Sequence, residues 1–311
     1  MHALTQLKSI GFKYYEGDLT KNLKSQGYRS ANPEDRAKEF MDLIKNPDVK
    51  CVMSTIGGWN SSSMIQYLDF DEIRKSRKII CGYSDITSLQ LAILKYSGLS
   101  TIYGPSLIPT FGEYPTIQNY SLESFLNVAT NRRLAEHTLH PPSKYSRQFI
   151  NAIPDDWQKK ESEREYQQNE GWRVLSEGFA SGEMIVANLE TLLALAGTTT
   201  FPDLKDKILI LEDEGSKFGL QERGFTQLLQ IGAFDNICGL IVSKPFSLNS
   251  EEAPFSYDDL IIEIVGKRSY PIISNFDCGH TIPSISLPIG AKAMVEAFDT
   301  KITFIINKIT I

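Results

Sequence analysis

The sequence has few of the residues that mark metal, redox and phosphate-binding sites. Among its 311 residues are only four histidines and four cysteines, and no two cysteines have the Cys-x-x-Cys spacing. Neither a Gly-Lys-Ser/Thr phosphate loop nor a Gly-x-Gly-x-x-Gly fingerprint is present. The cysteine spacing therefore suggests neither a zinc site nor a redox pair, and we interpret three or four of the cysteines as small buried apolar residues.

Basic residues are not in excess, and long apolar runs are absent. The chain has 32 Lys and Arg against 38 Asp and Glu, a formal net charge of −6. Such a charge gives no attraction to nucleic acid or anionic lipid. No apolar stretch has the length of a membrane span, and Lys8 interrupts the start of the chain before a signal-peptide core could form. We expect a cytoplasmic protein without nucleic-acid or membrane partners.

The composition is that of a globular protein, with 41% apolar and 23% charged residues. In residues 1–135, strand-like runs at 12–15, 51–56 and 78–81 alternate with helical stretches at 33–45 and 86–96. This alternation predicts an α/β domain with a parallel, flavodoxin-like sheet. The start of the helix at 33–45 is well marked, because Asn32 can cap it and Pro33 suits its first position.

The rest of the chain predicts a connection and a second domain. Residues 136–176 contain Pro141-Pro142 and many charges with little apolar periodicity, as expected of an interdomain connection. Residues 177–311 predict a smaller mixed α/β C-terminal domain with short antiparallel strands. Its expected elements are strands at 207–211, 236–242, 271–275, 291–298 and 302–306 and a helix at 219–231.

A candidate nucleophile lies where the strand at 79–81 turns abruptly into a helix. Ser84 occupies this turn, in the outline of a nucleophile elbow, and the main-chain N–H of Asp85 could stabilise an oxyanion there. The simpler alternative is that Ser84 or Asp85 only caps the helix. A second turn contains Gly57 and Gly58, and it fits a second oxyanion donor or a substrate-facing loop better than a phosphate cradle.

A serine nucleophile needs a base and an acid that orients the base. His2 is at the chain end and His137 and His140 lie in the polar connection, whereas His280 follows an apolar strand and is the natural base. The strand at 208–211 runs into three acids, 212–214, whose spacing alone does not identify the one that acts. The absence of Gly two residues after the serine, and of an HGGG run, argues against the α/β-hydrolase fold.

Several separated motifs resemble the LD-carboxypeptidase family of serine peptidases, especially its branch with the microcin C self-immunity carboxypeptidase. They are IGGWNS at 56–61, GYSDIT at 82–87, YGPS at 103–106, LED at 211–213, FDCGHT at 276–281 and LPIG at 287–290. The resemblance implies a catalytic triad of Ser84, Glu212 and His280, an active site between the two domains, and a homodimer. It implies no metal or organic cofactor. It also indicates that the family begins one strand earlier, so we expect a sheet without that strand.

The resemblance leaves the substrate open between a murein tetrapeptide and an aminoacyl-nucleotide-like toxin. The alternative to a serine carboxypeptidase or amidase is a catalytically idle ligand-binding protein with the same fold. We expect Trp59, Asn60, Trp157 and Asn188 to bind the substrate, with Trp172 as another candidate for stacking. The residues before Asn188 are Val186 and Ala187 where the family has two glycines, and we expect them to narrow the cleft.

Overall fold

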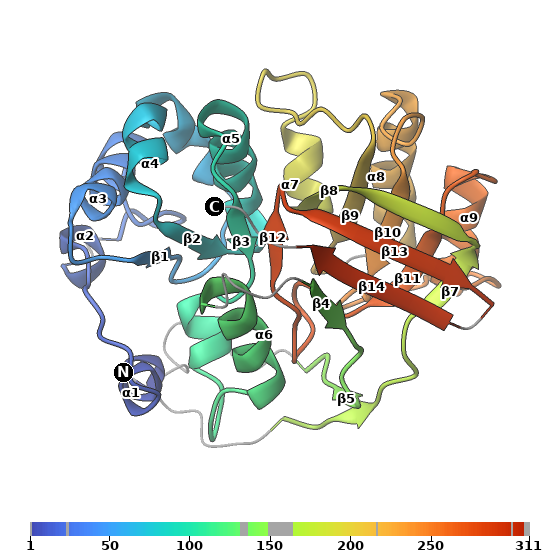
Figure 1. The fold of residues 1–311 in the computed structure, drawn as a ribbon, viewed down its shortest axis with the longest axis horizontal. Helices are drawn as coiled ribbons and strands as arrows, with labels where there is room; N and C mark the ends of the chain where they lie inside the picture. The colour runs from blue at the N-terminus through green and yellow to red at the C-terminus, as the bar shows by residue number, and fades with distance from the viewer. Residues whose placement is uncertain are drawn as a thin grey trace.

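The chain folds around two β-sheets that lie side by side (Figure 1). The computed structural model describes residues 2–22, 25–130, 136–148, 164–215, 217–299 and 301–307. Across the first sheet the order is β1 (Cys51–Met53), β2 (Ile79–Gly82), β3 (Thr101–Tyr103) and β12 (Leu287–Ile289). The first three strands are parallel, as predicted, and β12 joins them antiparallel from the far end of the sequence.

The second sheet has eight strands and is mixed. Its order is β4 (Glu136–Leu139), β14 (Lys301–Asn307), β13 (Lys292–Phe298), β8 (Gly178–Asn188), β9 (Lys207–Glu212), β10 (Gly239–Ser243), β11 (Ile272–Phe276) and β7 (Arg173–Ser176). Strands β8 to β11 are parallel and the others antiparallel. The expected mixed α/β class is confirmed. The size of this sheet was not anticipated, because β4 and β7 come from the segment interpreted as a connection, which also forms the pair β5 (Lys144–Tyr145) and β6 (Gln167–Gln168).

Helices surround both sheets. In the first half of the chain they are α1 (His2–Ser9), α2 (Asp18–Lys21), α3 (Pro33–Lys45), η1 (Ser61–Tyr67), α4 (Phe70–Ser76), η2 (Ser84–Ile86), α5 (Thr87–Ser97), η3 (Leu107–Phe111) and α6 (Asn119–Thr130). In the second half they are α7 (Leu189–Ala194), α8 (Phe218–Gln230) and α9 (Tyr257–Val265). Among the described residues, no helix combines the length and the apolar character that crossing a bilayer requires.

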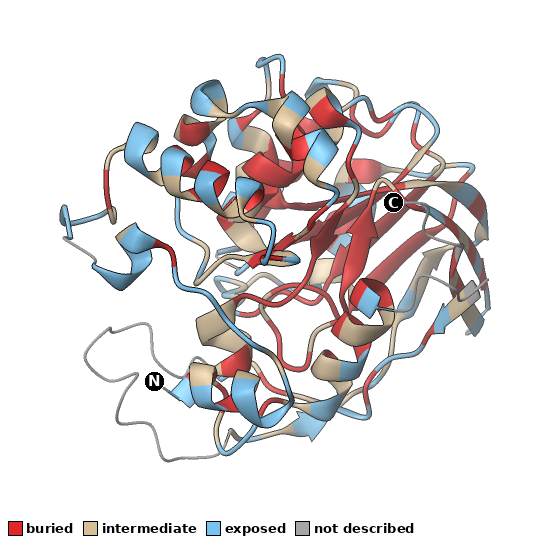
Figure 2. Cartoon of the chain, turned by 60° about the vertical axis from the view of Figure 1, so that its left-hand side comes forward, coloured by how far each residue is buried: buried red, intermediate tan, exposed pale blue. Residues whose placement is uncertain are grey.

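Alternation along the strands of the first sheet builds two separate cores. Val52 and Ile80 face α3, η1, α4 and α5, whereas Cys81 and Ile102 face α1 and α6. Successive strand residues point to opposite faces, so a parallel sheet covered on both sides buries nearly every residue. Figure 2 shows this layering, with buried strands between helices that expose only their outer sides.

Helix α3 begins as the sequence predicted. The side chain of Asn32 accepts a hydrogen bond from the N–H of Asp35 at 2.8 Å, and Pro33 is the first helical residue. The strand predicted at 12–15 is wrong, because this segment pairs with no strand and leaves Tyr15 61% exposed. Tyr14 instead lies under the ammonium group of Lys8, 5.1 Å from the ring centroid.

The cysteines are only partly as expected. All four are free; Cys81 and Cys278 are buried, but Cys51 and Cys238 are partly exposed. Cys51 lies on β1 at the edge of the first sheet, and Cys238 directly precedes β10, so neither is enclosed on all sides.

Candidate active site

The candidate site forms where strands of both sheets end. Ser84 follows β2, Tyr103 ends β3, Asn188 ends β8, Glu212 ends β9, and His280 follows β11. The carboxyl ends of parallel strands are the usual place for ligand sites in α/β folds, because loops and helix N-termini converge there. The two sheets therefore bring residues that are up to 196 positions apart, from 84 to 280, into one region.

Ser84 has the strained backbone of a nucleophile elbow. Its φ is +63°, whereas Tyr83 before it is extended, and η2 and α5 follow directly. A left-handed conformation is uncommon for residues other than glycine and costs free energy that the surrounding contacts must offset. The N–H of Ser84 donates to the hydroxyl of Tyr103 at 3.0 Å. Ser84 therefore lies at a helix N-terminus, where negative charge is stabilised.

The Gly57-Gly58 turn lies directly against the elbow. A Cβ atom on Gly57 would be 3.0 Å from Cβ and 3.1 Å from Oγ of Ser84, so a side chain here would press against the elbow and displace it by a few tenths of an ångström. Gly58 has a φ of +142°, which also favours glycine. In the described residues, the N–H groups of Gly58 and Asp85 donate to no protein acceptor, as oxyanion donors require.

The side chain of Asp85 ties this turn to the elbow. Its Oδ2 accepts hydrogen bonds from the N–H of Asn60 at 3.0 Å and of Ser61 at 2.8 Å. The hydroxyl of Ser61 donates back to the main-chain oxygen of Asp85 at 2.5 Å. Burial raises the pKa of Asp85, which these hydrogen bonds partly counteract. The carboxylate thus caps η1 and fixes two main-chain segments with respect to each other.

His280 and Glu212 form a buried pair. Nδ1 of His280 lies 2.7 Å from Oε2 of Glu212, which is 2% exposed. Burial lowers the pKa of His280, but the charge of Glu212, its hydrogen bond, and the charges of Glu214 and Asp213 outweigh burial and raise this pKa above 6.5. Gly279 permits the contact, since its φ is +97° and a Cβ there would lie 2.1 Å from Oε2 of Glu212.

The three acids 212–214, at and just after the end of β9, have different surroundings. Glu212 faces His280, whereas the two oxygens of Asp213 accept from the side chain of Gln221 at 3.0 Å and the N–H of Gly215 at 2.6 Å. Burial raises the pKa of Asp213 to about 6. Glu214 is exposed. Only the first acid contacts the imidazole, which agrees with the alternation of side chains along a strand.

Tyr83, which directly precedes Ser84, contacts His280. The rings of Tyr83 and His280 meet edge to face, with centroids 4.9 Å apart and an interplanar angle of 72°. In the described part of the chain, Ser84 Oγ does not hydrogen-bond to His280. Such bonds are often long in unliganded sites and shorten when substrate binds.

A buried ion pair that the sequence analysis missed anchors the His280 loop. Lys244 and Asp277 are each 0% exposed, and their Nζ and Oδ1 atoms are 2.6 Å apart. Asp277 also accepts from Asn169 at 3.1 Å and from the indole N–H of Trp172 at 3.0 Å. Nζ of Lys244 lies 4.3 Å from the ring centroid of Tyr145. The sequence signal that could have indicated this pair is Asp277, an acid in an apolar run three residues before His280.

The residues expected to bind substrate have different surroundings. Trp59 is 85% exposed beside Gly58, whereas Oδ1 of Asn60 accepts from the guanidinium of Arg36 at 2.6 Å. Asn188 donates to Glu212 at 3.1 Å and caps α7. Trp157 lies outside the described residues, and Trp172 packs against Phe276, with ring centroids 4.7 Å apart.

Val186 and Ala187 are both 0% exposed, so their side chains fill the core of the second sheet and do not face a cleft. The other three histidines are elsewhere: His2 on α1, His137 on β4, and His140 just after β4.

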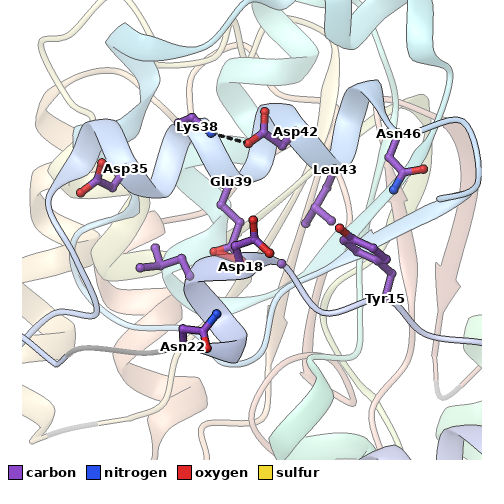
Figure 3. A pocket seen from close by; sticks show the side chains of 11 residues that line it. Tyr15, Asp18, Asn22, Asp35, Lys38, Glu39, Asp42, Leu43 and Asn46 are labelled. Carbon is purple, nitrogen blue, oxygen red and sulfur yellow. Dashed lines mark hydrogen bonds and ion pairs between the residues drawn. The ribbon is translucent and has the colours of Figure 1, made fainter.

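Two hollows in the described surface lie outside this constellation. Figure 3 shows one of them, lined by side chains of α2 and α3 that include Asp18, Glu39 and the Lys38–Asp42 ion pair. The other lies between α7 and α8 and includes Asp213. Neither is lined by Ser84, Glu212 or His280. Within the described ranges, no cluster of three or more His, Cys, Asp or Glu residues could hold a metal ion.

Comparisons with known proteins identify the family of this chain. Residues 1–104 match the LD-carboxypeptidase N-terminal domain and residues 181–295 the LD-carboxypeptidase C-terminal domain. The microcin C7 self-immunity protein MccF of Escherichia coli is 36% identical over 95% of this chain and 84% of its own length. A protein of Bacillus subtilis named probable murein peptide carboxypeptidase is 28% identical over 94% of this chain and 83% of its own.

A solved structure of MccF in complex with aspartyl sulfamoyl adenosine superimposes with a TM-score of 0.91 and 32% identity, over 99% of this chain and 91% of that one. Both halves of the family's architecture are matched, and the similarity covers nearly the entire sequence. The chain belongs to the LD-carboxypeptidase family, in the branch that contains MccF.

Proposed function

We propose that the chain is a serine peptidase that hydrolyses an amide bond with Ser84, His280 and Glu212. Oγ of Ser84 attacks the carbonyl carbon while its proton passes to Nε2 of His280. The main-chain N–H groups of Gly58 and Asp85 stabilise the oxyanion. The imidazolium then protonates the leaving amine, and the C–N bond breaks. Water attacks the acyl-enzyme with His280 again as base, which releases the acid and restores Ser84.

The pairing of His280 with Glu212 beside a strained serine carries this proposal. The carboxylate accepts from Nδ1, which leaves Nε2 of the same ring free to act as the base. The φ of +63° at Ser84 and the close approach of Gly57 supply the other half of the arrangement. A protein that only binds a ligand has no need for this combination, which disfavours the alternative of an idle binding protein.

For the substrate, we propose an aminoacyl-nucleotide-like compound first. The support is the similarity to MccF, which has been solved in complex with aspartyl sulfamoyl adenosine. Trp59 has an exposed indole next to the Gly57-Gly58 turn, where the ring can stack on a nucleotide base. A murein tetrapeptide is the second candidate, because a relative named as a murein peptide carboxypeptidase also matches nearly the entire chain.

Two measurements test the proposal. A fluorophosphonate probe should label the wild type and Ser76→Ala, a surface control on α4, but not Ser84→Ala. Hydrolysis of an aminoacyl sulfamoyl adenosine and of a murein tetrapeptide should then be followed in parallel by mass spectrometry. Labelling of Ser84→Ala, or tight binding of either compound without hydrolysis by the wild type, would overturn the proposal.

A further inference from the structure

The hydroxyl of Tyr103 joins the two halves of the site. It accepts a hydrogen bond from the N–H of Ser84 at 3.0 Å and donates one to Oε1 of Glu212. The other oxygen of the same carboxylate contacts His280. One phenol therefore links the main chain of the proposed nucleophile to the acid that orients the base. The side chain of Tyr103 is 0% exposed, so water cannot compete for either bond.

The direction of these bonds is fixed by chemistry. Burial raises the pKa of Tyr103 well above its usual value of 10, and the negative charge of Glu212 raises it further. The phenol therefore keeps its proton near neutral pH. A carboxylate can only accept, so the phenol donates to Glu212 and offers its lone pair to the N–H of Ser84.

The scaffold holds the phenol in place. Gln90 is 0% exposed, and its Nε2 donates to the main-chain oxygens of Gly82 at 3.0 Å and Ile102 at 2.7 Å. It thus clamps the ends of β2 and β3, from which Ser84 and Tyr103 emerge. Asn188 shares Oε1 of Glu212 with the phenol, but its own oxygen is occupied as the cap of α7. The side chain of Asn188 therefore does not join Glu212 to Ser84 as Tyr103 does, and its main-chain N–H donates to the hydroxyl of Thr87 at 3.1 Å, at the start of α5.

We infer that Tyr103 is a positioning residue of this site, a role that rests on the proposed Ser84–His280–Glu212 mechanism. Its bond to Oε1 turns Oε2 toward His280, and its acceptor oxygen supports the strained main chain at Ser84. The donor also withdraws charge from Glu212. Removing it should strengthen the attraction of the carboxylate for the imidazolium and raise the pH at which His280 becomes a base.

The test is Tyr103→Phe, with Tyr270→Phe as the matched control. Tyr270 is also buried and donates to a main-chain oxygen, that of Phe234, at 2.8 Å, but it contacts none of the proposed triad. We expect Tyr103→Phe to lower kcat/KM by a factor on the order of 10 to 100 and to shift its acid limb to higher pH. The control should leave the position of that limb unchanged. An unshifted limb in Tyr103→Phe would contradict the inference, whatever its rate.

A second variant guards against misfolding of the first. Incorporation of 3-fluorotyrosine at position 103 preserves the shape and makes the phenol a stronger donor, so the acid limb should shift to lower pH. An acid limb that is the same as in the wild type would also contradict the inference. Ser84→Ala distinguishes failure of this inference from failure of the proposed mechanism. If Ser84→Ala abolishes labelling by the fluorophosphonate, but Tyr103→Phe and the 3-fluorotyrosine variant both keep the wild-type acid limb, only the role of Tyr103 is wrong.

Discussion

The two sides of the site are built by different physical means. On the side of the proposed nucleophile, the main chain sets the geometry, through the left-handed Ser84 and the glycine that packs closely against it. On the side of the proposed acid and base, buried charge sets the geometry, through Glu212 with His280 and through Lys244 with Asp277. The first side stores conformational strain, and the second carries the cost of removing ions from water.

Because of this difference, we expect the two sides to be sensitive to different kinds of substitution. Backbone geometry is disturbed by adding atoms, as at the glycine positions. A charge network is disturbed by removing one partner, which leaves the other buried and unpaired. Tyr103 is the contact common to both sides, and the following predictions test how separate they are.

The largest effect is expected from Ser84→Ala. Loss of the nucleophile should lower kcat by a factor on the order of 10⁴ to 10⁶, because the remaining residues cannot form an acyl-enzyme. The melting temperature should be unchanged within a few degrees, since the hydroxyl makes no hydrogen bond to the described residues. Steady-state kinetics and calorimetry on the same preparation check both parts. A kcat within tenfold of the wild type would exclude Ser84 from the chemistry.

Glu212→Gln should lower kcat by a factor on the order of 10³ to 10⁴. The amide can donate where the carboxylate must accept, which favours the wrong tautomer of His280 and leaves the imidazolium unstabilised. Asp213→Asn and Glu214→Gln are the controls and should remain within about tenfold of the wild type, because neither acid contacts the ring. If Asp213→Asn is the most damaging of the three, the assignment of Glu212 is wrong.

Lys244→Met should destabilise the fold by roughly 3–5 kcal/mol, because Asp277 remains buried without its cation. Denaturant unfolding measures this loss. Lys38→Met is the control: it breaks an ion pair whose side chains are 73% and 59% exposed, and it should leave the unfolding midpoint unchanged. Equal midpoints for the two variants would show that the buried pair does not anchor the His280 loop.

Gly57→Ala should lower kcat by a factor on the order of 10 to 100. The added methyl would lie 3.0 Å from Cβ of Ser84 and displace the Gly57-Gly58 turn, which carries a proposed oxyanion donor. Gly219→Ala, on α8, has only an ordinary contact at 3.7 Å and should have wild-type activity. The acid–base side should be unaffected, so the pH profile of Gly57→Ala should keep its shape. A profile shifted along the pH axis would mean that the two sides are not separable.

The smallest expected effect is the pH dependence of the wild-type rate and stability. Because the pKa of His280 is raised above 6.5, kcat/KM should fall as the pH decreases through a midpoint above 6.5. The same shift stabilises the folded protein below pH 6.5, and this contribution is lost as the pH rises through the folded-state pKa. Unfolding measured from pH 5 to 8 should show the loss in the wild type and not in Glu212→Gln. A flat rate profile across that range would argue against a histidine base.

Local signals in the sequence accounted for much of the fold. The cap and proline at Asn32 and Pro33 predicted the start of α3, and apolar runs predicted β2, β9 and β13 to within a few residues. The predicted strand at 12–15 failed because a strand exists only with a partner, and none is present there. Strands β4 and β7 were missed for the converse reason, because a distant partner makes strands of weakly patterned segments.

By itself, the sequence determined the type of most elements, the serine at the strand-to-helix turn and the one histidine that we propose as its base. These features depend on neighbours in the chain: a strand, a tight turn, and glycines that permit it. Spacing left three acids open and only the family resemblance selected Glu212, which the tertiary structure places against His280. Tertiary structure alone decided that Lys244 pairs with Asp277 and that Tyr103 connects both sides. The physical reason is that a hydrogen bond between buried side chains is set by where distant strands end, which no local pattern encodes.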